Sequence, residues 1–128
     1  MYSVKGIINE GFTTKVKTTN GSEYAMYIKD GDSPMDFFTV AYSGCIAMCV
    51  KGYFFRTYEL VNLPVEINLD VDYDNKKIVA NIFVERTVEE LDNGDREGAL
   101  ENVKLRCKVS HLLDKELDIS YNVQPLDK

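Results

Sequence analysis

The sequence lacks several features that would place it in a common functional class. It has three cysteines, an odd number, and residues 1–20 contain no apolar export segment. A framework of structural disulfides is therefore not expected, and the thiols are left with core packing, metal ligation or redox chemistry. The longest apolar stretch, residues 37–50, is interrupted by polar and small residues, so we expect neither a signal peptide nor a membrane span.

A cluster of basic residues is also missing. The formal net charge is −6, and the acidic residues are spread along the chain, which is the wrong sign for binding a phosphate backbone. We therefore expect a soluble, cytoplasmic protein without a nucleic-acid or membrane partner. With 128 residues, 45% of them hydrophobic, the chain is long enough for one core and too short for two, so residues 1–128 are expected to form one domain.

The first half of the sequence predicts strands followed by a helix. The Asn20-Gly21 pair between two β-prone runs is a hairpin signal, because both residues tolerate positive φ. Ser33 and Pro34 then form an N-cap followed by proline at the first helical position. The helix they open, residues 35–55, is apolar around most of its circumference and is expected to be buried on nearly all sides. The expected strands are residues 1–9, 12–18 and 23–29.

The second half predicts two more strands, a helix and a last strand. Residues 64–73 alternate apolar and polar side chains, which is the pattern of a strand with one wet face, and residues 77–88 supply its partner. An acidic segment, residues 89–95, leads into a helix over residues 96–106, and residues 117–123 form the last strand. The order βββ-α-ββ-α-β, with hairpins on both sides of an apolar helix, predicts an α+β fold.

Two segments carry the candidate chemistry. Cys45 and Cys49 share one helix face through their i,i+4 spacing, and Cys107 and His111 would do so if the second helix continues. The neighbours Arg106 and Lys108 carry charges that favour a thiolate at Cys107, although neighbours in sequence point in different directions on a helix.

Each of these residues also has a plainer interpretation. We interpret Cys49 as a packing residue and His111 as a satisfied surface or core residue. The alternative in which Cys45, Cys49, Cys107 and His111 hold zinc is weaker, because structural zinc ligands more often come from tight turns, and no metal is expected.

The same two segments resemble a known family. Residues 33–47, SPMDFFTVAYSGCIA, resemble the central-helix signature of the OsmC and organic hydroperoxide resistance (Ohr) family, and residues 107–113, CKVSHLL, resemble its Cys-Pro-Val-Ser-x-x-Leu motif with Lys108 in the place of proline. The resemblance implies an intertwined homodimer that covers the central helix. It also implies a peroxidatic Cys45 whose thiolate attacks an organic hydroperoxide, a resolving Cys107 and an external dithiol reductant, with no cofactor.

The sequence departs from that family where the thiolate is activated. The resemblance implies an arginine from the N-terminal strands and a glutamate at the helix start, yet residues 1–32 contain no arginine. Lysines stand there instead, and a lysine lacks the planar fork that holds a carboxylate and a thiolate together. The glutamate position is taken by Met35 or moved to Asp36. We therefore name Asp36, Lys15 and Lys17 as candidate thiolate-supporting residues, with Arg56 and Arg86 as substitutes from elsewhere in the chain.

Two functional hypotheses follow. The first is a thiol-dependent peroxidase that reduces organic hydroperoxides through Cys45 and Cys107. The second is a non-catalytic OsmC-like protein that binds a small-molecule or lipid-like ligand in an apolar groove near the central helix. The second hypothesis fits the missing arginine and the aromatic residues of that region, which are Phe37, Phe38, Tyr42, Tyr53, Phe54 and Phe55.

Overall fold

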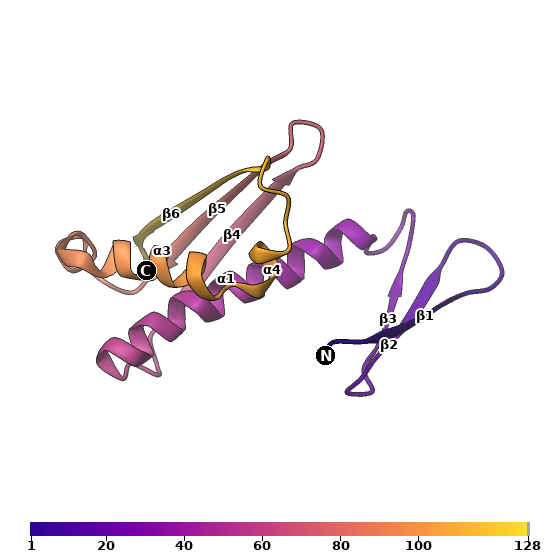
Figure 1. Cartoon of the computed structure of the whole chain (residues 1–128), viewed down its shortest axis with the longest axis horizontal. Coiled ribbons are helices and arrows are strands. Elements are labelled where there is room, and N and C mark those ends of the chain that lie inside the picture. Colours follow the sequence, from indigo (N-terminus) through magenta and orange to yellow (C-terminus); the bar gives the residue numbers. More distant parts are fainter. Residues whose placement is uncertain (128) are drawn as a thin grey trace. The chain divides into compact units, whose positions relative to one another are not determined.

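The computed structural model describes residues 1–127, and its contacts divide the chain into two compact units, Met1–Phe38 and Thr39–Lys128. The prediction of one domain over residues 1–128 stays a prediction. Figure 1 shows the elements, which are β1 (Val4–Ile8), β2 (Thr14–Thr18), β3 (Glu23–Met26), α1 (Pro34–Tyr58), β4 (Val65–Asp72), β5 (Lys77–Val84), α2 (Val88–Glu90), the kinked turn η1 (Leu91–Asp95), α3 (Arg96–Arg106), α4 (Lys108–His111) and β6 (Asp118–Pro125).

The first unit contains the predicted meander. Strands β1, β2 and β3 pair antiparallel in that order. The β2–β3 hairpin turns at the predicted Asn20-Gly21 pair, where Gly21 has a φ of 87° and its N–H donates to the Thr18 carbonyl at 3.0 Å. The ring of Tyr24 on β3 packs edge-on against Phe37, with 5.7 Å between the ring centroids.

Helix α1 begins where the sequence predicts. The amide and hydroxyl of Ser33 both donate to the Asp36 carboxylate, at 2.8 and 2.9 Å, and the Asp36 amide donates back to the Ser33 carbonyl at 3.0 Å. Pro34 takes the first helical position, where its missing N–H costs nothing. This reciprocal cap fixes the start of the helix.

The second unit is one sheet covered on one face by helices. Strand β5 pairs antiparallel with β4 and parallel with β6, so that Leu69, Ala80 and Tyr121 lie side by side across the sheet. Alternate residues of β5 are fully or almost fully buried, and α1 and α3 both lie on that face of the sheet (Figure 1). The α+β prediction is confirmed, whereas the parallel pairing of the last strand was not predicted.

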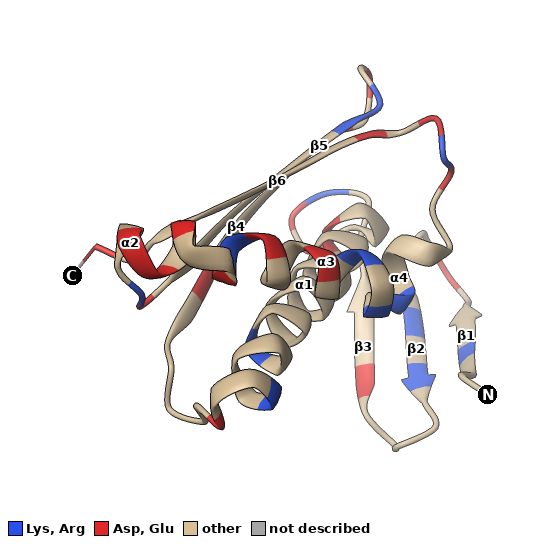
Figure 2. Ribbon diagram, turned by 60° about the vertical axis from the view of Figure 1, so that its left-hand side comes forward, with Lys and Arg blue, Asp and Glu red and all other residues tan. Residues whose placement is uncertain are grey.

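The segment between β5 and β6 forms several short helical elements, whereas the sequence predicts one helix. The predicted helix over residues 96–106 is confirmed as α3, but the acidic segment before it forms two further turns, α2 and η1. The predicted helix does not continue past Arg106, and this continuation was the condition for Cys107 and His111 to share one helix face. Cys107 has extended backbone angles, φ −74° and ψ 100°, and a separate short helix, α4, begins at Lys108. Figure 2 shows acidic residues concentrated on α2 and on the start of α3.

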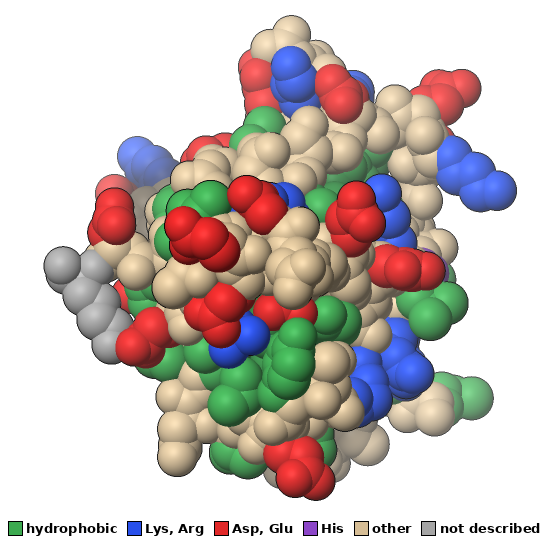
Figure 3. Space-filling view, turned by 90° about the vertical axis from the view of Figure 1, so that its left-hand side faces the viewer, with side chains coloured by type: hydrophobic (Ala, Val, Ile, Leu, Met, Phe, Trp, Pro, Cys, Tyr) green, Lys and Arg blue, Asp and Glu red, His purple; other side chains and the backbone are tan. Residues whose placement is uncertain are grey.

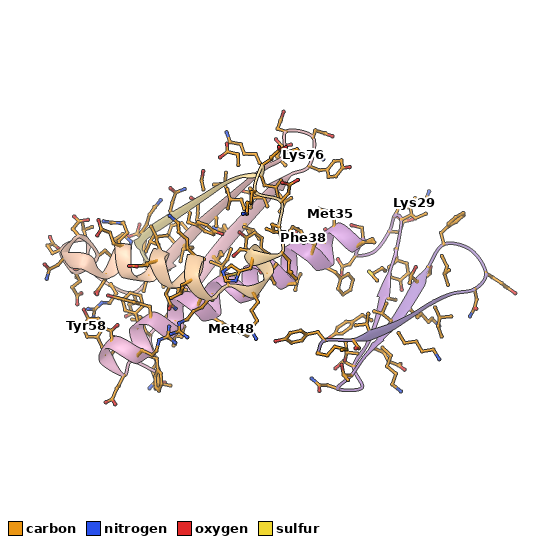
Figure 4. The ribbon with its side chains drawn as sticks, viewed as in Figure 1. Lys29, Met35, Phe38, Met48, Tyr58 and Lys76 are labelled. Atoms are coloured by element: carbon orange, nitrogen blue, oxygen red, sulfur yellow. The ribbon has the colours of Figure 1, made fainter. Side chains whose placement is uncertain are left out.

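Within one chain, α1 is buried on one side only. Its fully buried residues, Tyr42, Ile46, Val50 and Phe54, follow an i,i+4 stripe. Met48 is 77% exposed, and Figure 4 shows it on the side of α1 away from the β4–β6 sheet. By length and composition α1 is also able to cross a membrane, a test that the core helix of a soluble protein passes as well. The homodimer and the absence of a membrane partner stay predictions.

Candidate thiol site

The fold brings the two predicted site cysteines together. Cys45 lies near the middle of α1, and Cys107 occupies the break between α3 and α4. Their sulfur atoms are 3.1 Å apart and both thiols are free. A disulfide bond is about 2.05 Å long, so a small movement of either side chain would join them. The break at Cys107 is what turns this side chain toward α1, because the residue leaves the helical path there.

Hydrogen-bond donors surround the Cys45 thiol. Burial alone would raise its pKa, but four groups donate toward the sulfur, and their combined effect holds the Cys45 pKa below its ordinary value. They are the Val109 amide, the Cys107 thiol, the Lys108 amide and, most weakly, the Cys49 thiol. These two amides are the first ones of α4, the short helix that the break at Cys107 creates. The arrangement favours a thiolate at Cys45.

The other two thiols are shifted the opposite way. Cys107 is fully buried, and burial together with its contact to Cys45 raises its pKa. Burial and the charge of a Cys45 thiolate raise the pKa of Cys49 to about 11. The expectation that Arg106 and Lys108 favour a thiolate at Cys107 is therefore wrong. The contribution of Lys108 comes from its backbone amide and acts on Cys45.

A group of hydroxyls completes the site on the side of Cys107. Tyr42 of α1 and Tyr121 of β6 hold their hydroxyl oxygens 2.5 Å apart, and Tyr42 is fully buried. Ser110 of α4 donates its hydroxyl to the Cys107 carbonyl at 2.8 Å and also contacts Tyr121 and the Cys107 thiol. Burial raises the pKa of both tyrosines, so both hydroxyls stay protonated and able to donate.

The candidate thiolate-supporting residues belong to the first unit. Asp36 is engaged in the helix cap, and the Ser33 amide and hydroxyl lower the pKa of its carboxyl. Lys15 and Lys17 lie on β2 and line an open concavity of about 660 Å³ together with Lys5 of β1. Their support of the thiolate stays a prediction.

The two arginines named as substitutes bind other partners. Arg56 donates to the Asn102 side-chain oxygen at 2.5 Å, and Asn102 in turn donates to the Cys49 carbonyl. Arg86 forms ion pairs with Asp95 and Glu90 at 3.0 and 2.8 Å. Neither guanidinium is among the largest influences on the pKa of Cys45, and the charge of Arg56 acts on Cys49, whose pKa it lowers.

The structure also bears on the role of His111 and on the zinc alternative. His111 is exposed, and its Nε2 lies 2.8 Å from the Lys104 carbonyl oxygen, which agrees with its interpretation as a satisfied surface residue. Within residues 1–127, no group of three or more His, Cys, Asp or Glu side chains is arranged to hold a metal ion.

Sequence reasoning missed the hydroxyl and amide partners of the thiols. Ser110 and the two α4 amides fall inside residues 107–113, so the motif resemblance contained the signal without showing what it does. Tyr121 carries no such signal, because only the parallel pairing of β6 with β5 brings it opposite Tyr42.

Solved structures similar to this chain align over nearly its full length. An OsmC-like protein from Mycoplasma pneumoniae aligns with a TM-score of 0.66 at 11% identity, covering 98% of this chain and 96% of that one. The organic hydroperoxide resistance protein OsmC from Legionella pneumophila gives 0.64 at 13%, covering 97% and 96%. OhrB from Bacillus subtilis gives 0.60 at 12%, covering 97% and 98%.

The chain has the OsmC-like fold. The resemblance drawn from the two cysteine motifs is thereby confirmed at the level of the fold. No protein-family model matches the sequence, and no curated protein matches it. At identities this low, the shared OsmC-like fold places the two cysteine segments in a known architecture and leaves the chemistry to be argued from the thiols.

Proposed function

We propose that this protein is a thiol-dependent peroxidase that reduces organic hydroperoxides. The observation that carries the proposal is the thiol pair itself, with 3.1 Å between the Cys45 and Cys107 sulfur atoms and with opposite pKa shifts. A lowered pKa suits the thiol that attacks, and a raised pKa suits a partner that stays protonated until the attacking thiol has been oxidised. Three of the similar structures are named organic hydroperoxide resistance proteins, which supports the substrate class.

The reaction proceeds in three steps. The Cys45 thiolate attacks the distal oxygen of the hydroperoxide, the O–O bond breaks, and the alkoxide takes up a proton and leaves as an alcohol. Cys45 is now a sulfenic acid. The Cys107 sulfur, losing its proton, attacks the Cys45 sulfur and displaces the hydroxyl group as water. An external dithiol then reduces the disulfide and is itself oxidised.

We further propose that the protein works in the cytoplasm as a homodimer, in which a second copy covers the exposed side of α1. The exposed fractions of Val40 and Met48 are 67% and 77%, and contact with a second copy would remove these apolar side chains from water. Figure 3 shows acidic side chains scattered over the face that it draws, and a net charge of −6 supports the proposal that nucleic acid is not a partner.

The test is to titrate the reduced protein with cumene hydroperoxide and to map the oxidised cysteines by mass spectrometry. Wild type is expected to form the Cys45–Cys107 disulfide, Cys107→Ser to stop at a sulfenic acid on Cys45, and Cys45→Ser to remain reduced. Cys49→Ala is the matched control and is expected to form the same disulfide as wild type. If both site thiols stay reduced at a modest excess of hydroperoxide, the peroxidase proposal is wrong.

Ligand binding is a second candidate, and it rests on the concavity of the first unit. Its volume of about 660 Å³ falls in the range of small-molecule sites, and Ile7 adds an apolar surface beside Lys15 and Lys17. An apolar ligand with an anionic group fits this lining. Binding of a fluorescent fatty acid that is weakened by Lys15→Ala with Lys17→Ala, in a protein whose thiols resist hydroperoxide, would favour this candidate.

A further inference from the structure

Cys107 must lose its proton to act as the resolving thiol, and its burial opposes this loss. Cys107 is fully buried, so its sulfur must lose a proton in an environment that disfavours the negative charge. It must do so as the nucleophile that closes the disulfide, and it regains negative charge as the leaving group when the disulfide is reduced. Groups that donate hydrogen bonds to this sulfur would assist both steps.

One hydroxyl is placed where it can provide this help, and two tyrosine hydroxyls lie beside it. Ser110 is anchored by its hydrogen bond to the Cys107 carbonyl, and its amide and hydroxyl both interact with the Cys107 sulfur. The Ser110 hydroxyl also contacts the hydroxyl of Tyr121, which lies 2.5 Å from that of Tyr42. The three side chains come from α4, β6 and α1, so the contact between them fixes the position of α4 against the sheet and the central helix.

We propose that Ser110 and Tyr121, supported by Tyr42, are positioning residues for the resolving cysteine. The Ser110 hydroxyl, which donates to the Cys107 carbonyl in the reduced protein, turns to donate to the Cys107 sulfur as negative charge develops there, and the Tyr121 hydroxyl holds Ser110 in place. This proposal rests on the proposed function, because it assigns Cys107 the resolving role. It goes further by naming the residues that set the rate of disulfide closure rather than the rate of the first oxidation.

The test uses the aromatic disulfide 5,5′-dithiobis(2-nitrobenzoic acid) in place of a hydroperoxide, with the Cys49→Ala chain as the parent, so that only the two site thiols react. In the first phase, the Cys45 thiolate attacks the reagent, forms a mixed disulfide and releases one thionitrobenzoate. In the second phase, the Cys107 sulfur loses its proton, attacks the Cys45 sulfur and expels the other thionitrobenzoate. The second phase is unimolecular, so its rate does not depend on reagent concentration.

Ser110→Ala is expected to slow the second phase about tenfold, the effect of losing one hydrogen bond to a developing charge. Tyr121→Phe removes the hydroxyl that holds Ser110 and is expected to slow the same phase. The first phase is expected to keep its parent rate. Ser110→Thr retains the hydroxyl and is expected to restore closure. Tyr53→Phe removes a tyrosine hydroxyl on α1 that bonds Asp95, away from the thiols, and is the matched control expected to close at the parent rate.

Three results would overturn the proposal: parent closure rates in both variants, equal slowing of both phases, or the absence of a unimolecular second phase in the parent. A parallel titration of the parent with cumene hydroperoxide separates this outcome from a failure of the proposed function. A chain that closes its disulfide with the aromatic reagent and ignores the hydroperoxide retains the positioning residues and loses the peroxidase assignment.

Discussion

At the scale of single residues, the three thiols of this chain differ because of the donors that each one faces. Burial raises the pKa of all three thiols, but at Cys45 the hydrogen bonds that the sulfur receives, two of them from amides at the start of α4, outweigh it. Charged neighbours in the sequence do not decide the order of reactivity. The side chain of a residue adjacent to a cysteine points elsewhere, while a backbone amide brought across by the fold points at the sulfur.

This difference predicts selective alkylation by iodoacetamide. The lowered pKa of Cys45 means that its thiolate fraction is present at lower pH than that of an ordinary cysteine, while Cys49, with a pKa of about 11, stays protonated. At pH 7, modification mapped by mass spectrometry is expected at Cys45 well before Cys49. The rate at Cys45 is expected to level off at lower pH than the rate of the same cysteine in urea-unfolded protein. Equal rates at the two sites in the folded chain would contradict the assignment.

At the scale of elements, much of the fold could be predicted because periodicity and capping are local signals. The Ser33-Pro34 start of α1, the turn at Asn20-Gly21 and helix α3 all follow from neighbouring residues. The parallel pairing of β6 and the break at Cys107 could not be predicted, since both depend on contacts between residues far apart in the sequence. The same limit hid Tyr121 from the candidate site, although the two cysteines themselves were predicted.

The kinked turn η1 before α3 is held by a buried carboxylate, and removal of this carboxylate is expected to destabilise the protein. Asp95 is 3% exposed and accepts hydrogen bonds from Tyr53, Tyr58 and Arg86. Asp95→Ala would leave the Arg86 guanidinium without its buried partner, at a cost of about 3 kcal/mol in the free energy of unfolding. Urea denaturation measures this loss. Glu90→Ala removes the more exposed partner of Arg86 and is expected to cost less than about 1 kcal/mol.

The same carboxylate predicts a dependence of stability on pH. Burial opposes ionisation of Asp95, but hydrogen bonds from Tyr58, Arg86 and Tyr53 outweigh it and lower its pKa. The stability that this shift supplies is complete above the ordinary aspartate pKa of 3.8 and is lost as pH falls through the lower folded value. Asp95→Asn is therefore expected to unfold with less dependence on pH below 4 than wild type. An identical acid profile for both proteins would show that Asp95 does not supply this stability.

At the scale of the whole molecule, one apolar side of α1 is left exposed by the chain itself. The sequence indicates a helix apolar nearly all round, and the chain buries one stripe of it against the sheet and α3. With 3.6 residues per turn, Gly44, Met48 and Phe55 fall on the opposite side, where Gly44 would allow close approach of another helix. A sequence reveals that such a surface is apolar but does not reveal how much of it the chain itself can cover.

Met48→Asp is expected to convert a dimeric protein into a monomer. In a symmetric dimer the substitution occurs twice, and it replaces an apolar side chain on each copy of α1 by a charge that the interface would have to desolvate. Even a loss of about 1.4 kcal/mol from each copy weakens the dimer about 100-fold. Light scattering after size-exclusion chromatography measures the mass. Tyr73→Asp, at the exposed β4–β5 turn, is the matched control and is expected to remain dimeric. A monomeric wild type, or a Met48→Asp variant as dimeric as wild type, would mean that this side of α1 is not the surface through which two copies associate.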